Sequence, residues 1–282
     1  MSKFEDLQNL MIKYHFRPEK KLSQYFCTNE ALLQFLVNSA ELKKGDVVLE
    51  IGPGTGFLTE KLVSVAKKNG AKVIVIEVDE LMCEILSTEF KESIDSEVLK
   101  VVQGSFLDKD FEELKVNKII SLPPYHLSSE LVLKIALTRG LESAVLALDS
   151  GFAQKLTAFE GLPEYVALTA FVSLNSNIEI LENNISPQSF FPAPNCFSTV
   201  LKITFNRKNN SKEYYTFIKE IFRHRNKDLS RAIKQAMPFL VKELNWSEKE
   251  LNQKILTLKN PSKKVCLHSP QDLLSVYKHF TK

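Results

Sequence analysis

Residues 46–62 read DVVLEIGPGTGFLTEKL and contain a β-branched run, a glycine-rich turn and the start of a helical pattern. The run from Asp46 to Ile51 predicts a buried strand, and the residues after the turn have apolar side chains at helical spacing. Between them, Gly52, Gly54 and Gly56 suit a backbone that turns sharply and comes close to a ligand at the start of a helix. The stretch therefore predicts an α/β fold with a ligand-binding loop after a central strand.

The same alternation of strand and helix patterns continues along the chain. The predicted strands lie at 72–78, 98–103, 118–121 and 144–148. The predicted helices lie at 30–38, 80–90 and 128–137. Strands that alternate with helices form a parallel sheet covered on both faces. Two extended segments, 177–183 and 198–205, flank a proline-rich stretch and predict an antiparallel pair at one edge of that sheet.

Charge divides the chain into two parts. The 282 residues have a formal net charge of +3, yet residues 207–282 hold 17 basic and 7 acidic side chains, which leaves 20 and 27 for residues 1–206. We expect a larger domain over 1–206, with a basic leading segment at 1–29, and a small second domain with helical spacing at 214–240 and 247–258. A basic domain favours an acidic partner, with nucleic acid first and a membrane surface second.

The remaining composition limits the possible functions. The four cysteines stand far apart, without a Cys-x-x-Cys pair or a histidine at metal-ligand spacing, so we expect reduced thiols and no metal site. The first residues lack the apolar core of a signal peptide, and no run approaches the roughly 20 apolar residues of a membrane span. We therefore expect a cytoplasmic protein without a membrane partner.

A carboxylate accompanies the glycine loop. Glu77 follows Gly56 by 21 residues, at the end of the next predicted strand, where it can accept hydrogen bonds from both hydroxyls of a ribose. A tight turn beside a solvated acid would give the same pattern, and a dinucleotide is an alternative nucleoside ligand. The G-x-G-x-G spacing after Glu50 resembles the first motif of S-adenosylmethionine-dependent methyltransferases, so we favour S-adenosylmethionine as the cofactor.

A proline-rich turn ends the fourth predicted strand. Residues 119–129 read IISLPPYHLSS and lie where open α/β sheets bind their ligands, at the carboxyl end of a strand. The two prolines make a rigid turn, and the ring of Tyr125 after them can stack on a base taken out of its helix. A proline-rich loop with a packing tyrosine is the structural alternative.

Together these motifs resemble, over nearly the whole chain, the small-subunit ribosomal RNA adenine dimethyltransferases. Leu49–Leu58 is similar to the glycine motif of that family, and Phe190–Ser198 fits its F-x-P-x-P-x-V-x-S signature, which is more specific than a glycine loop. Val75–Asp79 is similar to the ribose-binding strand end of the family, and Lys21–Phe26 to its leading Gly-Gln-Asn-Phe segment. Phe222–Lys227 is similar to its F-x-x-R-R-K helix, and Val265–Leu273 to the archaeal and eukaryotic form of its C-terminal segment.

The resemblance implies a class I methyltransferase fold, Rossmann-like with a mostly parallel seven-stranded sheet, and a small all-helical C-terminal domain. It implies a monomer that transfers two methyl groups to the exocyclic amine of each of two adjacent adenosines near the 3′ end of small-subunit rRNA, during ribosome biogenesis. Pro124 and Tyr125 would face the target base. The residues that would hold S-adenosylmethionine or border its pocket are Gly52, Gly54, Gly56, Glu77, Tyr25, Phe26 and Cys27.

Several positions depart from the family pattern. The directing asparagine after the fourth strand falls on Leu122, which cannot accept a hydrogen bond from the target amine. The aspartate beside the cofactor adenine falls on Ser105, the asparagine of the leading segment on Tyr25, and two polar residues after the fifth strand on Asp149 and Gly151. The sequence thus favours an rRNA adenine dimethyltransferase. The alternatives are a catalytically weak or inactive RNA-binding factor for ribosome assembly or transcription and, third, a small-molecule methyltransferase.

Basic residues of the C-terminal part are the candidate RNA contacts. Within the helical pattern of 214–240 these are Arg223, Arg225, Lys227, Arg231 and Lys234. Side chains three or four residues apart on a helix share a face, so most of them would lie together. Phosphate contacts from such a face would give affinity without base specificity and a steep dependence on salt. A solvated helix face is the alternative, and the charge excess favours RNA.

Overall fold

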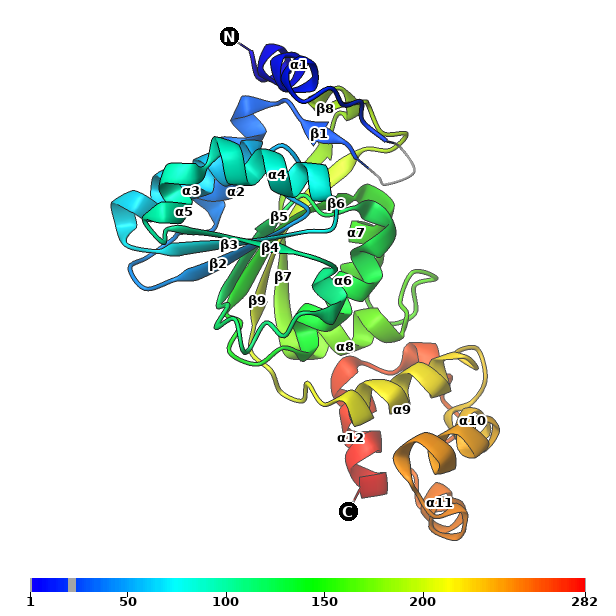
Figure 1. Ribbon diagram of the computed structural model, residues 1–282. Coiled ribbons are helices and arrows are strands. Elements are labelled where there is room, and N and C mark those ends of the chain that lie inside the picture. Colours follow the sequence, from blue (N-terminus) through cyan, green and yellow to red (C-terminus); the bar gives the residue numbers. More distant parts are fainter. Residues whose placement is uncertain (1, 20–23, 282) are drawn as a thin grey trace. The chain divides into compact units, whose positions relative to one another are not determined.

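The computed structural model describes residues 2–19 and 24–281, and the chain divides into two compact units (Figure 1). The first unit holds the chain up to Lys134, with Thr138–Ala153 and Glu179–Thr204; the second holds Ile135–Leu137, Gln154–Ile178 and the chain from Phe205 onward. Part of the second compact unit therefore precedes residue 207 in the sequence. The functional division into domains at 1–206 and 207–282 stays a prediction.

A seven-stranded sheet in the order β4-β3-β2-β5-β6-β9-β7 forms the centre of the first unit (Figure 1). Its strands are β2 (Val47–Ile51), β3 (Lys72–Glu77), β4 (Leu99–Gln103), β5 (Lys118–Ser121), β6 (Ser143–Asp149), β7 (Ser176–Ile185) and β9 (Ser198–Phe205). Neighbouring strands from β4 to β6 are parallel, and β9 runs antiparallel to β6. The predicted α/β fold is confirmed, with the two late segments side by side at one edge.

Helices cover the sheet because their apolar faces match its buried β-branched runs. In Figure 1, α2 (Glu30–Ser39), α3 (Phe57–Asn69) and α4 (Glu80–Glu89) lie on one side and α6 (Ser128–Leu137) lies on the other. Leu33 of α2 and Leu62 of α3 share one apolar cluster with strand residues such as Val48, all fully buried. The order of strands changes direction between β2 and β5, which is where ligands bind in such sheets.

The leading part of the chain contains a helix that the sequence reading missed. Ser2 caps α1 (Lys3–Lys13) in a capping box with Glu5, and the helix is attached by ion pairs from Lys3 to Glu60 at 2.6 Å and from Lys13 to Glu89 at 2.7 Å. Farther on, β1 (Phe26–Cys27) pairs antiparallel with β8 (Phe190–Phe191). Lys21–Ser23 of the predicted leading motif lie outside the described residues. The shorter elements of this unit are α5 (Lys91–Asp95), η2 (Phe106–Asp108), η3 (Tyr125–Leu127) and η4 (Pro187–Ser189), and α7 (Ser150–Leu156) begins in this unit and ends in the second.

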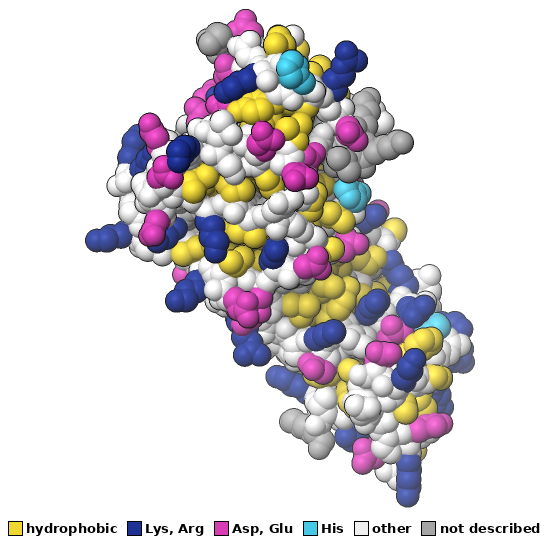
Figure 2. Space-filling view, viewed as in Figure 1, with side chains coloured by type: hydrophobic (Ala, Val, Ile, Leu, Met, Phe, Trp, Pro, Cys, Tyr) yellow, Lys and Arg dark blue, Asp and Glu magenta, His cyan; other side chains and the backbone are white. Residues whose placement is uncertain are grey.

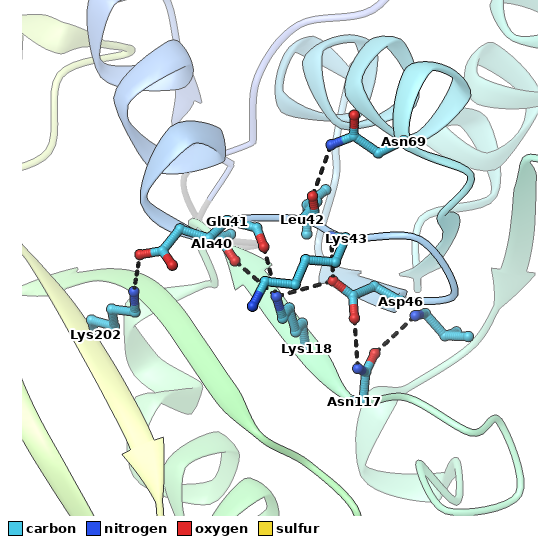
Figure 3. Close-up of polar contacts among 10 residues, drawn as sticks. Ala40, Glu41, Leu42, Lys43, Asp46, Asn69, Asn117, Lys118 and Lys202 are labelled. Atoms are coloured by element: carbon cyan, nitrogen blue, oxygen red, sulfur yellow. Dashed lines mark hydrogen bonds and ion pairs between the residues drawn. The ribbon is translucent and has the colours of Figure 1, made fainter.

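A buried ion pair joins the amino ends of β2 and β5 (Figure 3). The Nζ of Lys118 lies 3.0 Å from Oδ2 of Asp46 and donates to the carbonyls of Ala40 and Glu41 at 3.1 and 2.9 Å. The side chains of this pair are only 8% and 9% exposed, and Asn117 donates to Oδ1 of Asp46 at 2.8 Å. Burial alone would raise the pKa of Asp46, but these hydrogen bonds outweigh it and lower that pKa.

The second unit is helical. Its elements are α8 (Ala167–Asn175), α9 (Lys212–Phe222), α10 (Leu229–Leu244), α11 (Glu248–Ile255), η5 (Val265–Leu267) and α12 (Pro270–Thr281). The ring of Phe217 lies at the centre of an aromatic core, 5.7 Å from Trp246, 5.6 Å from Tyr277 and 6.1 Å from Phe280 between centroids. The predicted helical C-terminal part is therefore confirmed, although α8 and α12 were not predicted individually.

One helix prediction was wrong, because the helical pattern of 214–240 is interrupted. The helix α9 ends at Phe222 and α10 begins at Leu229, with turns between them. The carbonyls of Arg225 and Lys227 accept hydrogen bonds from the N–H groups of residues 266 and 265, at 3.0 and 3.1 Å. Partners distant in sequence thus replace the hydrogen bonds that a continuous helix would make.

Three features bear on the compositional expectations. All four cysteines are free, and Cys27, Cys83 and Cys266 are buried. Within residues 2–19 and 24–281, no helix is long and apolar enough to cross a membrane. In the same ranges, no three His, Cys, Asp or Glu side chains come together as a metal site would require.

Candidate active site

The glycine loop between β2 and α3 has the backbone that its sequence predicts. Gly54 and Gly56 have φ angles of 55° and 86°, in the left-handed region that favours glycine. A Cβ on Gly54 would lie 2.8 Å from a ring carbon of Phe26, and one on Gly56 would lie 2.5 Å from a ring carbon of Phe90. The close neighbours of these two glycines are therefore side chains of the protein itself, the rings of Phe26 and Phe90 and a methyl group of Leu86, whereas the sequence predicts a ligand in this space.

Glu77 ends β3 with its carboxylate fixed beside the loop. Its Oε2 accepts a hydrogen bond from the N–H of Gly54 at 3.1 Å, and its Oε1 accepts from the N–H groups of Val78 and Asp79 at 2.8 and 3.1 Å. Burial raises the pKa of Glu77, and the three backbone donors only partly counteract this rise. The side chain is 7% exposed, so it has one fixed orientation at the edge of a pocket.

One pocket lies at the carboxyl ends of β2, β3 and β5 and collects most of the predicted site. The predicted residues that line it are Tyr25, Phe26, Cys27, Gly52, Gly54, Glu77, Leu122 and Pro124. Lining residues that the sequence reading did not assign include Glu50, Thr55, Asp79 and Met82. Burial raises the pKa of the Cys27 thiol to about 12, so the thiol contributes a neutral, apolar wall.

Ser105 and Gly56 do not line this pocket. Gly56 instead precedes the first residue of α3, where the turn into the helix needs it. The hydroxyl of Ser105 accepts a hydrogen bond from the N–H of Leu107 at 3.1 Å and caps η2. A contact of Ser105 with a cofactor adenine stays a prediction.

The end of β5 presents an apolar side chain where an amide would be needed. Leu122 lines the pocket and packs against the apolar core of the first unit. Ser121, the nearest hydroxyl in sequence, is fully buried and donates to the carbonyl of Ile51 at 2.6 Å. A shifted loop that brings Ser121 into the pocket would break this bond, so neither residue supplies an acceptor there.

Tyr125 begins η3, just beyond the residues that line the pocket. Its hydroxyl lies 2.6 Å from the Oγ of Ser198, the first residue of β9, and its ring is nearly parallel to that of Tyr25. Burial raises the pKa of Tyr125, so the phenol stays protonated at neutral pH. Tyr25, expected at the border of the cofactor pocket, thus lies beside Tyr125, and a contact of Tyr125 with the target base stays a prediction.

Glu50 gives the site a testable dependence on pH. It is fully enclosed, Thr59 donates to its Oε2 at 2.6 Å, and burial raises its pKa to about 8, with Glu77 adding to the rise. A carboxyl whose folded pKa is raised contributes stability below its unfolded pKa and loses it as the pH rises through the folded value. Stability should therefore fall from about pH 5 to pH 8, by on the order of a few kcal/mol.

The Glu50→Gln variant should flatten that decline in urea unfolding measured across this range. Some slope should remain, because the pKa of Glu77 is raised as well. Thr59→Val is the matched variant: without the hydroxyl donor the pKa of Glu50 should rise further, and the decline should extend to higher pH. Parallel curves for the wild type and Glu50→Gln would contradict this account.

The predicted RNA contacts differ in their surroundings. Arg225 is half-buried, and its guanidinium donates to the carbonyls of Pro163 and Leu162 at 2.6 and 2.9 Å, so it holds a loop of the second unit. Arg223 is exposed but bonds Glu220 at 3.1 Å and lies over the ring of Phe239. The prediction that Arg223 and Lys227 share a helix face with Arg231 and Lys234 is wrong, because Arg223 and Lys227 lie in the turns between α9 and α10.

Lys227, Arg231 and Lys234 remain exposed, and the last two lie on α10. Arg231 has a long ion pair to Asp228, at 3.7 Å. Figure 2 shows further Lys and Arg side chains spread over the visible face of the C-terminal helices, with acidic residues among them. The second unit thus carries a basic surface to which α10 contributes three exposed cations, Arg231, Lys234 and Lys242.

The chain has a mostly parallel sheet, an acidic residue at the end of the strand that follows the glycine loop, and a proline-rich turn beside the same pocket. These features define a methyltransferase of the Rossmann-like class. Within that class, the chain belongs to the ribosomal RNA adenine dimethylase family, whose pattern matches residues 15–270.

Curated relatives extend over nearly the same length. The chain is 31% identical over 280 residues to a probable ribosomal RNA small subunit methyltransferase A of Methanopyrus kandleri, a match that covers 98% of this chain and 92% of the relative. A protein of the same name from Pyrococcus furiosus is 33% identical over 249 residues, covering 88% and 84%.

Solved structures show the same fold. A crystal structure of a dimethyladenosine transferase from Plasmodium falciparum superposes with a TM-score of 0.76 at 26% identity, covering 91% of this chain and 97% of that one. The 23S rRNA methyltransferase ErmE superposes with a TM-score of 0.61 at 17% identity, covering 91% and 100%.

Proposed function

We propose that this protein dimethylates adjacent adenosines near the 3′ end of small-subunit rRNA during ribosome biogenesis, with S-adenosylmethionine as methyl donor. The observation that carries the proposal is one pocket in which the Glu77 carboxylate, the glycine loop and the turn at Pro124 meet. Family membership and the names of the relatives support the substrate class. The monomeric state and the cytoplasmic location stay predictions.

The residues of the pocket fit the cofactor. A buried carboxylate at the end of β3 can accept a ribose hydroxyl, since Oε2 has a further lone pair beyond its bond from Gly54, whereas Oε1 already accepts two backbone hydrogen bonds. The loop at Gly52 and Gly54 lines the same pocket and would accommodate the methionine part against bare backbone. When bound, S-adenosylmethionine supplies a sulfonium methyl group that an amine nitrogen attacks directly.

The protein would position the target base and keep it dry. Tyr125 offers an aromatic face whose hydroxyl is fixed by Ser198, so its ring orientation is set before the base arrives. Pro124 gives the turn beside it a rigid backbone. Because the side chain of Leu122 offers no hydrogen-bond acceptor, the orientation of the amine depends on backbone carbonyls, shape and stacking, and we expect slow methyl transfer.

Incubation of the purified protein with small ribosomal subunits and labelled S-adenosylmethionine tests the proposal. We expect label in adenosines near the 3′ end of the rRNA. Subunits from a host strain that lacks the protein are the proper substrate, because their sites are unmethylated. No label at high enzyme concentration would refute methylation.

A second function is favoured by Leu122 and by the buried bond of Ser121. A chain without an acceptor for the amine could still bind rRNA and serve as an assembly or transcription factor. Calorimetric titration with S-adenosylmethionine separates the two functions. Tight binding favours the enzyme, whereas absent binding together with retained RNA binding favours the factor.

Leu122→Asn should increase methyl transfer. An amide at this position can accept a hydrogen bond from the target amine and direct its lone pair, and single groups of this kind are worth about 100-fold or more in rate. We expect kcat to rise at least tenfold, with little change in KM for RNA, measured by single-turnover label transfer. Leu122→Ala, which removes the leucine without adding an amide, should not increase the rate; equal rates in the two variants would contradict the prediction.

Arg231→Ala and Lys234→Ala should weaken RNA binding in a manner that depends on salt. If each side chain contacts one phosphate, the slope of log K against log salt should become less steep by about 0.7–0.9 per variant. Arg225→Ala serves as the contrast. Because its guanidinium bonds two carbonyls of the protein, it should lower the melting temperature with a smaller change in that slope.

A further inference from the structure

A second pocket lies within the second unit, at the loop that follows α11. It has a volume of about 570 Å3 and is lined by residues 257–260 of this loop, by His268 and by one face of α12. None of the basic residues predicted to contact RNA lines it, and none of the residues that line the first pocket does. The pocket is therefore separate from the site already described.

This second pocket carries an excess of positive charge. Lys259 of the loop and Lys278 of α12 line it and are exposed, and neither forms an ion pair in the described part of the chain. Asp272 lines the pocket as well, but its Oδ2 lies 3.5 Å from Nζ of Lys263 and accepts from the N–H of Ser269 at 3.3 Å. Because Lys263 balances the charge of Asp272, the two unpaired lysines favour an anionic ligand.

His268 adds a buried acceptor to the pocket wall. The residue is 2% exposed and stands two positions before α12. Its ring donates a hydrogen bond to the carbonyl of Lys263, whereas Nε2 is buried and has no hydrogen-bond partner in residues 2–19 and 24–281. Burial, and next the charge of Lys263, lower the pKa of His268, so the ring is neutral at pH 7 and Nε2 is a bare acceptor. A buried acceptor without a donor is unfavourable, so a ligand that brings a donor would gain affinity there.

RNA combines the two groups that this pocket favours. In an RNA strand the 2′-hydroxyl of each ribose lies beside the 3′-phosphate, whereas DNA has the phosphate without the hydroxyl. The amide of Asn260, exposed on the loop, is a further donor for a phosphate oxygen. Nε2 of His268 has almost no contact with solvent, so a small turn of the ring toward the pocket would bring Nε2 and the 2′-hydroxyl together.

We propose that this pocket binds one ribose and its 3′-phosphate in an RNA strand, with the 2′-hydroxyl on Nε2 of His268 and the phosphate contacted by Lys259 and Lys278. Such a contact selects RNA over DNA without reading the base. The proposal goes beyond the proposed function, because it needs no methyl transfer. It holds equally for a methyltransferase and for an RNA-binding assembly factor.

Two short strands that differ only in the 2′-hydroxyl test this contact. The probes are hexauridylate and hexadeoxyuridylate, which contain no adenine and so do not present the target base, at low salt and without S-adenosylmethionine. The wild type should bind hexauridylate about 2- to 10-fold more tightly than hexadeoxyuridylate, the range for one hydrogen bond. Fluorescence anisotropy of end-labelled strands gives the two Kd values.

His268→Asn should remove the preference for RNA. Asparagine can keep the bond to the carbonyl of Lys263 but has no atom at the place of Nε2, so the two Kd values should become equal. Lys278→Ala should weaken both strands alike and make the slope of log K against log salt less steep by about 0.7, as for one phosphate of a single strand. His279→Asn is the control, because His279 lines the same pocket but its Nε2 lies 2.9 Å from the carbonyl of Lys254. Its ratio of Kd values should equal that of the wild type.

A measurement on the wild type keeps the test open if His268→Asn does not fold, as its melting temperature would show. Nitrogen NMR of the histidine side chains should show the Nε2 resonance of His268 change with hexauridylate and stay unchanged with hexadeoxyuridylate.

The outcomes separate this site from the proposed function. No binding of either strand, equal affinity of the wild type for both, or a preference that His268→Asn retains would overturn the proposal. Uridine 3′-monophosphate that binds as tightly as hexauridylate would show a site for free nucleotides and would also overturn it. A preference that depends on His268 would support the site even if no rRNA is methylated, a result that refutes only the enzyme.

Discussion

Replacement of Glu77 by glutamine should weaken S-adenosylmethionine binding by about 10- to 100-fold. A hydrogen bond to a charged acceptor is worth about 1.5–3 kcal/mol, a ribose hydroxyl would use the remaining lone pair of Oε2, and about 1.4 kcal/mol is a tenfold change in affinity. Glutamine has one oxygen, so its NH2 group would face either the N–H of Gly54 or those of Val78 and Asp79. The loop should be disturbed in addition to the lost charge. Calorimetric titration measures the change.

Glu80→Gln is the matched control for this prediction. Glu80 is an acid three residues later, exposed at the start of α4, and it does not line the pocket. The Kd for S-adenosylmethionine should be the same in Glu80→Gln and in the wild type, and RNA binding should be unchanged in both variants. Equal affinities of Glu77→Gln and Glu80→Gln for S-adenosylmethionine would show that the nucleoside binds elsewhere.

The sheet could be predicted from the sequence because its strands are buried on both faces. Such strands consist of near-continuous β-branched and apolar residues, so β5 and β9 begin and end at the predicted residues. The turn at GPGTG followed directly from the need for positive φ angles. Its acidic partner followed too, because parallel strands place their carboxyl ends at one edge.

Local patterns were less informative where distant backbone decides the structure. The segment from Arg223 to Asp228 contains neither glycine nor proline, yet it is not helical. Two of its carbonyls accept hydrogen bonds from the N–H groups of η5, and Asp228 pairs with Lys264, the residue before η5. Nothing within the segment signals this. The helix α1 differs from that segment, because a local signal for it is present in the sequence. Ser2 and Glu5 form a recognisable capping box, so this helix could have been predicted.

The candidate site was predicted in its composition and not in its geometry. Glu77, Leu122 and Pro124 could be assigned to one pocket because strand ends of a parallel sheet converge. The parallel rings of Tyr25 and Tyr125, the burial of Glu50 and the bonding of Arg225 to a loop depend on where separate segments meet. Spacing along the chain contains no information on such meetings.

Removal of the Lys118 side chain by substitution with alanine should lower the free energy of unfolding by about 3–5 kcal/mol, the usual cost of removing one partner from a buried pair. The substitution leaves Asp46 buried with its charge and removes the donor of two carbonyls, those of Ala40 and Glu41. Hydrogen bonds from the amide of Asn117 and the N–H of Lys43 would partly stabilise the remaining carboxylate. Urea unfolding gives the change in free energy, and an unchanged m-value would show that cooperativity is kept.

The double variant Lys118→Met, Asp46→Leu distinguishes a stranded charge from lost packing. Replacing both members of a buried pair by apolar residues is often neutral or stabilising, because no charge remains out of water. The double variant should therefore be more stable than Lys118→Ala, although two carbonyls and Asn117 lose partners. Lys202→Ala, which removes the more exposed pair with Glu41, should change stability little, since solvent screens it. A loss in Lys118→Ala no larger than that in Lys202→Ala would mean that the pair contributes as a surface pair does, despite its burial.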